Sequence, residues 1–198
     1  MNSTDSQSRL TDSGLLRASV MFSLIILLGM GLLYSLVGTA LGRGLFPRQA
    51  TGSMVMHDGK AIGSSLIAQP FTEARYFQPR PSAAGYSPMS AAGSNQARSN
   101  PELRKRIADA MTAVAERDGI EVHDVPGELV TQSGGGLDPD ISPAGAQVQI
   151  VRVANARGLD RARVAELVER HTSAPQYGVL GEPRVNVLEL NLALDAVR

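Results

Sequence analysis

A glycine run at residues 133–136, Ser-Gly-Gly-Gly, has the composition of a phosphate-binding loop. Backbone N–H groups in such a loop can surround phosphate oxygens, and the N-terminus of a following helix adds a favourable dipole. The lysine and the adjacent hydroxyl residue of such loops are missing, however, and Asp138 and Asp140 would repel phosphate. The sequence therefore favours the alternative, a loop that needs glycine for tight backbone geometry before a capped helix.

Ser133, Asp138 and either His171 or His123 supply the residue types of a nucleophilic triad. The Gly-x-Ser-x-Gly turn that exposes a nucleophilic serine is absent, and a triad is defined by geometry rather than by composition. The chain has no cysteine, and its 3 histidines are too scattered for metal-ligand spacing. His171 lies on an apolar stripe, which is typical of a packed, hydrogen-bonded side chain. The residues by themselves thus indicate neither a catalytic centre nor a metal site.

The segment over residues 18–42 is the element that must position the rest of the chain. No charged residue interrupts it, Arg17 and Arg43 flank it, and a bilayer core takes about 20 apolar residues of helix. A single helix pairs its own backbone polar groups in lipid, so the segment predicts one transmembrane helix. A cleaved secretory signal is the alternative, because residues 38–40 resemble a cleavage site, but the apolar run is longer than a signal core.

Small residues lie on one face of this predicted helix, at Gly31, Ser35, Gly38 and Gly42. They would let a second helix approach closely, whereas apolar surface alone does not drive helix pairing in lipid. We therefore expect a partner helix at this face, although glycine and serine are common in membrane helices generally.

The sequence predicts three parts: a disordered cytoplasmic tail over residues 1–17, the transmembrane helix over 18–42, and one mixed α/β domain over 43–198. A formal net charge of zero gives no electrostatic case for nucleic-acid binding. The expected elements of the domain are a hairpin over 51–68 with an Asp-Gly turn at 58–59, helices from Pro101 to Gly119, from Pro143 to Gly158 and after Asp160, and strands over 120–125 and 188–194.

Residues 69–100 form a long, proline-rich loop between the hairpin and the first helix of the domain. Loops of this length are uncommon in compact domains unless they are functional or disordered, and disordered linkers are poor in aromatic residues. We therefore expect an ordered loop, pinned to the domain or to a partner. Its aromatic residues and their neighbouring arginines are Phe71, Tyr76, Phe77, Tyr86, Arg75 and Arg80.

Several strings along the chain resemble, in order, those of the C subunit of the Kdp potassium-transporting ATPase. Each string alone is short, but together they run from the apolar helix almost to the C-terminus, and the first 17 residues lie outside the resemblance. The strings are residues 63–71, 76–83, 93–95, 129–139, 152–154 and 185–195.

This resemblance implies an accessory, non-catalytic subunit of a bacterial high-affinity, ATP-driven potassium uptake complex in the inner membrane. Its partners would be a channel-like potassium-translocating subunit, a P-type ATPase subunit and a very small membrane peptide. The family's anchor has its N-terminus in the cytoplasm, so the α/β domain would be extracytoplasmic. The family is also described as a catalytic chaperone that raises the affinity of the ATPase subunit for ATP. The phosphorylatable Asp-Lys-Thr-Gly of a P-type ATPase is absent here.

The residues that the resemblance assigns to contact with shared ATP are Ser133, Gly134, Gly135, Gly136 and Gln149. The chain departs from the family pattern at Val148, where a tryptophan is frequent, and at Ala68, where a glycine is frequent.

The aromatic residues in this proline-rich loop suggest that residues 76–95 are the edge by which the domain docks over the outer mouth of the channel-like subunit. Tyr76, Phe77 and Arg80 would be the partner contacts. Two other classes of function stay open on the residues alone. One is a membrane-anchored extracytoplasmic hydrolase that uses Ser133. The other is a free-standing binding module.

Overall fold

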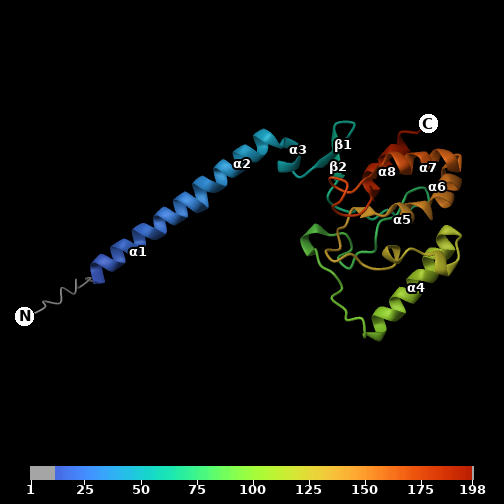
Figure 1. Ribbon diagram of the computed structural model, residues 1–198, viewed down its shortest axis with the longest axis horizontal. Coiled ribbons are helices and arrows are strands. Elements are labelled where there is room, and N and C mark those ends of the chain that lie inside the picture. The colour runs from blue at the N-terminus through green and yellow to red at the C-terminus, as the bar shows by residue number, and fades with distance from the viewer. Residues whose placement is uncertain (1–11, 198) are drawn as a thin grey trace, which may run out of the picture. The chain divides into compact units, whose positions relative to one another are not determined.

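The computed structural model describes residues 12–197, and the chain divides into two compact units, Met1–Ser53 and Met54–Arg198 (Figure 1). The described part of the first unit is helical almost throughout. Its elements are α1 (Asp12–Ile26), the π-helical η1 (Leu27–Leu33), α2 (Tyr34–Leu45) and α3 (Pro47–Ala50).

The first three of these elements form one continuous apolar helix. Residues Gly14–Leu45 of this helix are long and apolar enough to cross a membrane, and their side chains are not buried inside the structure. The single apolar helix predicted over 18–42 is thereby confirmed as a helix, and it extends beyond both predicted ends. Most of the tail predicted to be disordered, residues 1–11, lies outside the described residues. The predicted domain boundaries and the retention of the helix as an anchor stay predictions.

The π-helical segment η1 was not indicated by the sequence. A π-helix forms i→i+5 hydrogen bonds and winds more loosely than an α-helix. It contains Gly31, whereas Ser35, Gly38 and Gly42 lie in the α-helical α2. The last three therefore share the face that the α-helical spacing predicted, and a side chain built at Gly38 would meet no atom within 4 Å.

The second unit is a mixed α/β body, as predicted. Its helices and helical turns are η2 (Pro88–Ser90), α4 (Pro101–Asp118), η3 (Val122–Asp124), η4 (Gly127–Leu129), α5 (Pro143–Gln147), α6 (Ile150–Arg157), α7 (Arg161–Arg170) and α8 (Val187–Asp195). Its strands are β1 (Met54–His57), β2 (Lys60–Ser64), β3 (Asp140–Ile141), β4 (Thr172–Ser173) and β5 (Arg184–Asn186), which form an antiparallel β1–β2 hairpin and an antiparallel three-stranded sheet of order β3-β5-β4.

Local signals in the sequence account for most of these elements. Asp58 and Gly59 turn the β1–β2 hairpin with φ values of 49° and 74°, as a type I′ turn requires. Asn100 caps α4 by accepting a hydrogen bond from the Glu102 N–H, and Gly119 ends that helix with a φ of 67°. Asp160 caps α7 in the same way. The hairpin and both caps are confirmed.

The helix predicted from Pro143 to Gly158 is divided into α5 and α6. Ser142 caps α5 through its hydroxyl, which accepts from the Gly145 N–H at 3.0 Å, and Gly158 ends α6 in the left-handed region. The interruption falls at Val148 and Gln149.

The strand predicted over 188–194 is wrong, because these residues form α8. Four of the five buried positions in α8, namely Val187, Leu190, Asn191 and Leu194, follow the i, i+3, i+4, i+7 spacing of a helix face, and Leu188 is the fifth. The leucines at 188, 190, 192 and 194 alternate with Glu189, Asn191 and Ala193, which suggested a period of two. Asn191 is polar, so the sequence did not indicate that it belongs to the buried face of a helix. The strand predicted over 120–125 is also wrong, since η3 occupies that segment.

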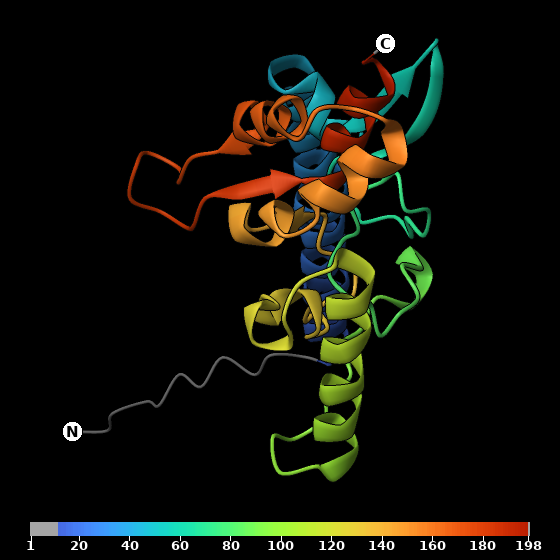
Figure 2. The same cartoon turned by 90° about the vertical axis from the view of Figure 1, so that its right-hand side faces the viewer.

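The core of the second unit forms where α6, α7 and α8 pack together beside β5, with α4 at the other end of the unit (Figures 1 and 2). α7 contacts α5, α6 and α8, and α4 contacts α6. The largest fully buried apolar side chains are Phe77, Ile141, Leu190, Leu194, Val153 and Val164. One of them, Phe77, comes from the long proline-rich loop rather than from a helix or strand.

The helical register of α8 predicts different costs for two neighbouring leucines. Leu190→Ala removes a fully buried side chain and should lower the free energy of unfolding by about 2–5 kcal/mol. Leu192 is only partly buried, so Leu192→Ala should cost roughly 1 kcal/mol or less. Urea unfolding of the full chain in detergent, followed by tyrosine fluorescence, measures both. Equal losses would contradict the helical register, because a strand puts both side chains on one face.

Candidate functional site

The segment Ala74–Gln78 of the proline-rich loop is held in place by side chains from the helices around it. Each of its five successive carbonyls accepts a hydrogen bond from a side chain. Arg152 donates to the carbonyls of residues 74 and 76 at 2.6 and 2.8 Å, and Arg157 donates to that of residue 75 at 2.7 Å. Asn191 and Gln149 donate to the carbonyls of residues 77 and 78. The predicted order of this loop is thus confirmed for this segment.

Two buried amides bind the backbone of adjacent residues in the way that a β-strand neighbour would. The Asn191 amide accepts from the Phe77 N–H at 2.8 Å and donates to the Phe77 carbonyl at 2.9 Å. The Gln149 amide accepts from the Gln78 N–H at 2.8 Å and donates to the Gln78 carbonyl at 3.1 Å. Both side chains are almost completely buried, so they satisfy backbone groups that water does not reach.

A buried charge cluster supports these contacts. Asp118, at the end of α4, has a fully buried side chain and binds both Arg117 and Arg152. Burial lowers the pKa of the Arg152 guanidinium, and the ion pair with Asp118 opposes that shift. Removing one partner of such a buried ion pair would leave the other charge buried without compensation, at a large cost in stability. The pair therefore holds its residues in this arrangement. Arg152 therefore links α4, α6 and the loop through one side chain.

Tyr76 is anchored on the same surface of the domain. Its hydroxyl donates to Asp195 at 3.1 Å and accepts from Arg75 at 2.7 Å, and this hydrogen bond raises the pKa of Arg75. The Arg157 guanidinium lies over its ring at 5.1 Å from the centroid. Phe77 is fully buried, so its ring contacts the core of its own domain rather than a surface offered to a partner.

Arg80 is the third residue of the predicted docking edge. It forms a 2.9 Å ion pair with Asp138, and its carbonyl accepts from the Tyr86 hydroxyl at 3.0 Å. The side-chain Nε of Arg80 is buried and finds no hydrogen-bond partner among residues 12–197. The predicted partner contacts of Tyr76 and Arg80 stay predictions, but both side chains already bind groups within the domain.

The glycine run packs tightly against the proline-rich loop. The Ser133 N–H donates to the Pro81 carbonyl at 3.3 Å, and the Gly136 carbonyl accepts from the Ser82 hydroxyl at 2.6 Å. Gly136 has a φ of +70°, and a Cβ built on it would lie 2.8 Å from the Ala92 carbonyl oxygen. The run therefore needs glycine at this position for backbone geometry and close approach, as the alternative interpretation from the sequence predicted.

Gly134 and Gly135 differ from the rest of the residues assigned to ATP. Both are exposed, a Cβ built on either would meet no atom within 4 Å, and among the described residues their N–H groups make no hydrogen bond. Ser133 and Gln149, by contrast, are buried, and the amide of Gln149 is bonded to Gln78, Gly145 and Arg152. The structure thus leaves only the tip of the glycine run open to a ligand.

Asp138 and His171, which the sequence offered as members of a nucleophilic triad with Ser133, form hydrogen bonds or ion pairs with other groups instead. Asp138 binds Arg80 and the Asp140 N–H, and the His171 Nδ1 lies 2.9 Å from the Leu167 carbonyl oxygen. Burial raises the pKa of Asp140, against the effect of the nearby Arg184. In the part of the chain that the structure describes, no hydrogen bond or ion pair joins Ser133 to these groups, and no cluster of potential metal ligands occurs.

Sequence reasoning missed the residues that position the loop, namely Asn191, Arg152 and Arg157. Asn191 carried a signal, because it is a polar residue within an otherwise apolar stretch of leucines. A polar side chain at such a place is retained when it satisfies a buried group. Arg152 and Arg157 occupy positions in a predicted helix where charged residues are common, so the sequence did not indicate that they bind the loop.

The contact between Asn191 and Phe77 predicts a large effect of removing one amide. Asn191→Leu keeps the branched shape of the side chain but leaves the Phe77 N–H and C=O buried without partners, at about 1–3 kcal/mol for each group. We expect a lower unfolding midpoint in urea and faster trypsin cleavage after Arg75, monitored by mass spectrometry. Asn155→Leu, on the exposed face of α6, is the matched control. Unchanged cleavage in the Asn191 variant would contradict the proposed role of the amide.

Comparison with known proteins gives a consistent result over most of the chain. Residues 16–196 match the family described as the c chain of the K⁺-transporting ATPase, KdpC. The potassium-transporting ATPase KdpC subunit of Xanthomonas campestris pv. campestris (strain B100) is 63% identical over 186 residues, covering 94% of this chain and 89% of its own length. The KdpC subunit of Methylococcus capsulatus is 48% identical over 185 residues, covering 92% and 97%.

A third relative, the KdpC subunit of Shewanella putrefaciens (strain CN-32), is 47% identical over 175 residues, covering 88% of both chains. The region that the family model matches, residues 16–196, includes the apolar helix, the loop segment Ala74–Gln78, and Gln149 and Asn191. The resemblance noted from the sequence is therefore confirmed, and this chain belongs to the KdpC family, the c chain of the K⁺-transporting ATPase.

Proposed function

We propose that the chain is the accessory, non-catalytic subunit of an ATP-driven, high-affinity potassium uptake complex, which it helps to assemble. Family membership together with one long, uncovered apolar helix carries this proposal. The helix would anchor the chain in the inner membrane, with its N-terminus in the cytoplasm and its α/β domain on the outer side. Its partners would be a channel-like potassium-translocating subunit, a P-type ATPase subunit and a small membrane peptide.

The rigid loop around Phe77 supports an assembly role over an enzymatic one. Its polar groups are bonded within the domain, so the domain is pre-organised and presents a fixed surface to other chains. The two open alternatives, an anchored hydrolase and a free-standing binding module, lack a comparable supporting observation.

A substitution on the small-residue face of the helix tests membrane assembly. Gly38→Leu fills a face that is open in this chain, so a partner helix could no longer approach closely. We expect less of the other ATPase chains to copurify with the tagged variant in mild detergent, and poorer growth at low potassium.

Gly44→Leu is the matched control for this experiment. It makes the same change in the same helix at a position that is also open, but on another face. Equal copurification of wild type and both variants would count against a helix partner at Gly38. A wild-type chain that purifies alone would contradict the assembly role itself.

We propose as a second candidate that the chain raises the affinity of the ATPase subunit for ATP, as a catalytic chaperone that shares the nucleotide. The open N–H groups of Gly134 and Gly135 favour this candidate, because paired backbone donors at a loop tip suit phosphate oxygens. Ser133, Gly136 and Gln149 would then act indirectly, by holding the tip in place.

Alanine at both tip glycines tests the nucleotide contact. Gly134→Ala and Gly135→Ala meet no atom within 4 Å, so the fold should be unchanged while the added methyl groups hinder a phosphate. We expect the ATP concentration for half-maximal ATPase activity of the purified complex to rise severalfold. Gly127→Ala, at an equally open glycine away from the run, is the control. An unchanged ATP dependence would contradict direct contact.

The side of the membrane on which the domain lies bears on the same question. The chain has no cysteine, and Met89 is 95% exposed, so a Met89→Cys variant carries a single accessible thiol. A membrane-impermeant maleimide that labels it in intact cells would support the outer placement. Because ATP is cytoplasmic, that result would also exclude direct contact between ATP and the glycine run.

A further inference from the structure

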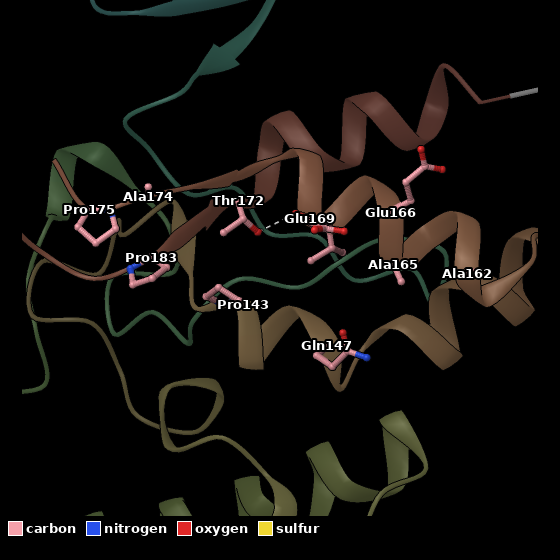
Figure 3. Close-up of a pocket in the computed structure, with 11 residues that line it drawn as sticks. Pro143, Gln147, Ala162, Ala165, Glu166, Glu169, Thr172, Ala174, Pro175 and Pro183 are labelled. Atoms are coloured by element: carbon pink, nitrogen blue, oxygen red, sulfur yellow. Dashed lines mark hydrogen bonds between the residues drawn. The ribbon is translucent and has the colours of Figure 1, made fainter. Parts of the chain in front are cut away.

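A groove of about 770 Å³ lies between α5 and α7 in the second unit, away from the glycine run (Figure 3). Small and rigid apolar residues line most of it, and no bulky side chain fills it. These residues are Pro143, Ala162, Ala165, Ala174, Pro175 and Pro183. A groove with such a lining has room for the side chains of another chain.

The charged residues that line the groove are both acidic. Glu166 and Glu169 come from α7, the helix that also supplies Ala162 and Ala165. Glu166 forms ion pairs with Arg163 and Arg170. Glu169 is exposed and forms no ion pair with any residue that the structure describes, so it leaves a carboxylate available to an incoming cation.

An exposed apolar loop begins and ends at two prolines of the groove, Pro175 and Pro183. Tyr177, Val179 and Leu180 in this loop are 84%, 79% and 56% exposed. The loop is nevertheless built as a tight turn, since Gln176 and Leu180 exchange backbone hydrogen bonds at 2.8 and 2.9 Å. A cluster of exposed aromatic and aliphatic side chains beside an apolar groove marks an interaction surface.

The chemistry of the groove selects among possible occupants. The uncompensated carboxylate of Glu169 would repel a nucleotide or an anionic lipid headgroup. A small polar ligand would need several convergent donors, and the hydroxyl of Thr172 already donates to the Val168 carbonyl at 2.8 Å. An apolar polypeptide segment with one cationic side chain satisfies both the lining and the free carboxylate of Glu169.

We propose that this groove and the adjoining Tyr177–Leu180 loop dock an apolar segment bearing a lysine or arginine from another chain of the potassium-transporting ATPase. This inference rests on the proposed accessory function. The cation of the segment pairs with Glu169, its apolar side chains fill the space between α5 and α7, and the loop covers it from the rim. The aromatic loop over residues 76–95, whose anchoring groups are bonded internally, is then a support of the domain rather than its docking edge.

Two substitutions in the full-length, tagged chain test this surface. Ala162→Trp fills the groove, and Glu169→Lys reverses its unpaired charge; both residues are exposed, so the fold should tolerate either change. The amount of partner chain that remains bound after detergent purification should fall at least about tenfold for each variant. The indole of Ala162→Trp takes the space of the incoming side chains, and Glu169→Lys places like charges together, which opposes binding. Ala108→Trp and Glu121→Lys, at exposed residues outside the groove, are the matched controls and should retain wild-type amounts.

A photo-crosslinking residue at Tyr177 gives an independent readout that does not depend on folding of the other variants. Under the proposal it forms a cross-link to a peptide of another ATPase chain that contains lysine or arginine beside apolar residues, identified by mass spectrometry. Groove variants that retain partners as the wild type does, or a cross-link only to a second copy of this chain, would overturn the inference alone. A wild-type chain without ATPase partners would overturn the proposed function and this inference together.

Discussion

The structure of the second unit depends on the pairing of one irregular backbone segment that has no strand beside it. Backbone polar groups that are withdrawn from water need partners, and the carbonyls of Ala74–Gln78, on both sides of the exposed-to-buried boundary, find them in side chains. The donors are Arg152, Arg157, Gln149 and Asn191. These side chains come from α6, α8 and the junction before α6. The segment thus joins elements that are far apart in the sequence, and Phe77 carries its contact into the core.

This arrangement explains why a long proline-rich loop can be rigid. A loop without strand partners ordinarily keeps its polar groups in water, at the surface. Here amides and guanidinium groups replace water, and the buried Asp118 fixes the central guanidinium of Arg152. These side chains stabilise the segment as a network rather than through separate contacts, because removing one of them leaves polar groups of the remaining residues without hydrogen-bond partners.

The same network separates the parts of the domain that hold its shape from those open to other molecules. Gln149, Ser133 and Phe77 are committed to internal contacts, whereas the tip of the glycine run and the groove between α5 and α7 face outward.

The sequence by itself determined the elements whose signals are local. The apolar helix, the Asp58–Gly59 turn and the caps at Asn100 and Asp160 depend on residues within a few positions of one another, so they were predicted correctly. Tertiary structure decided that residues 187–195 form the helix α8 rather than a strand, because the helix buries its apolar face. It also decided the roles of Gln149, Asn191 and Gly136. Their partners Gln78, Phe77 and Ser82 lie 71, 114 and 54 residues away in the chain, and only folding brings such groups within hydrogen-bond distance.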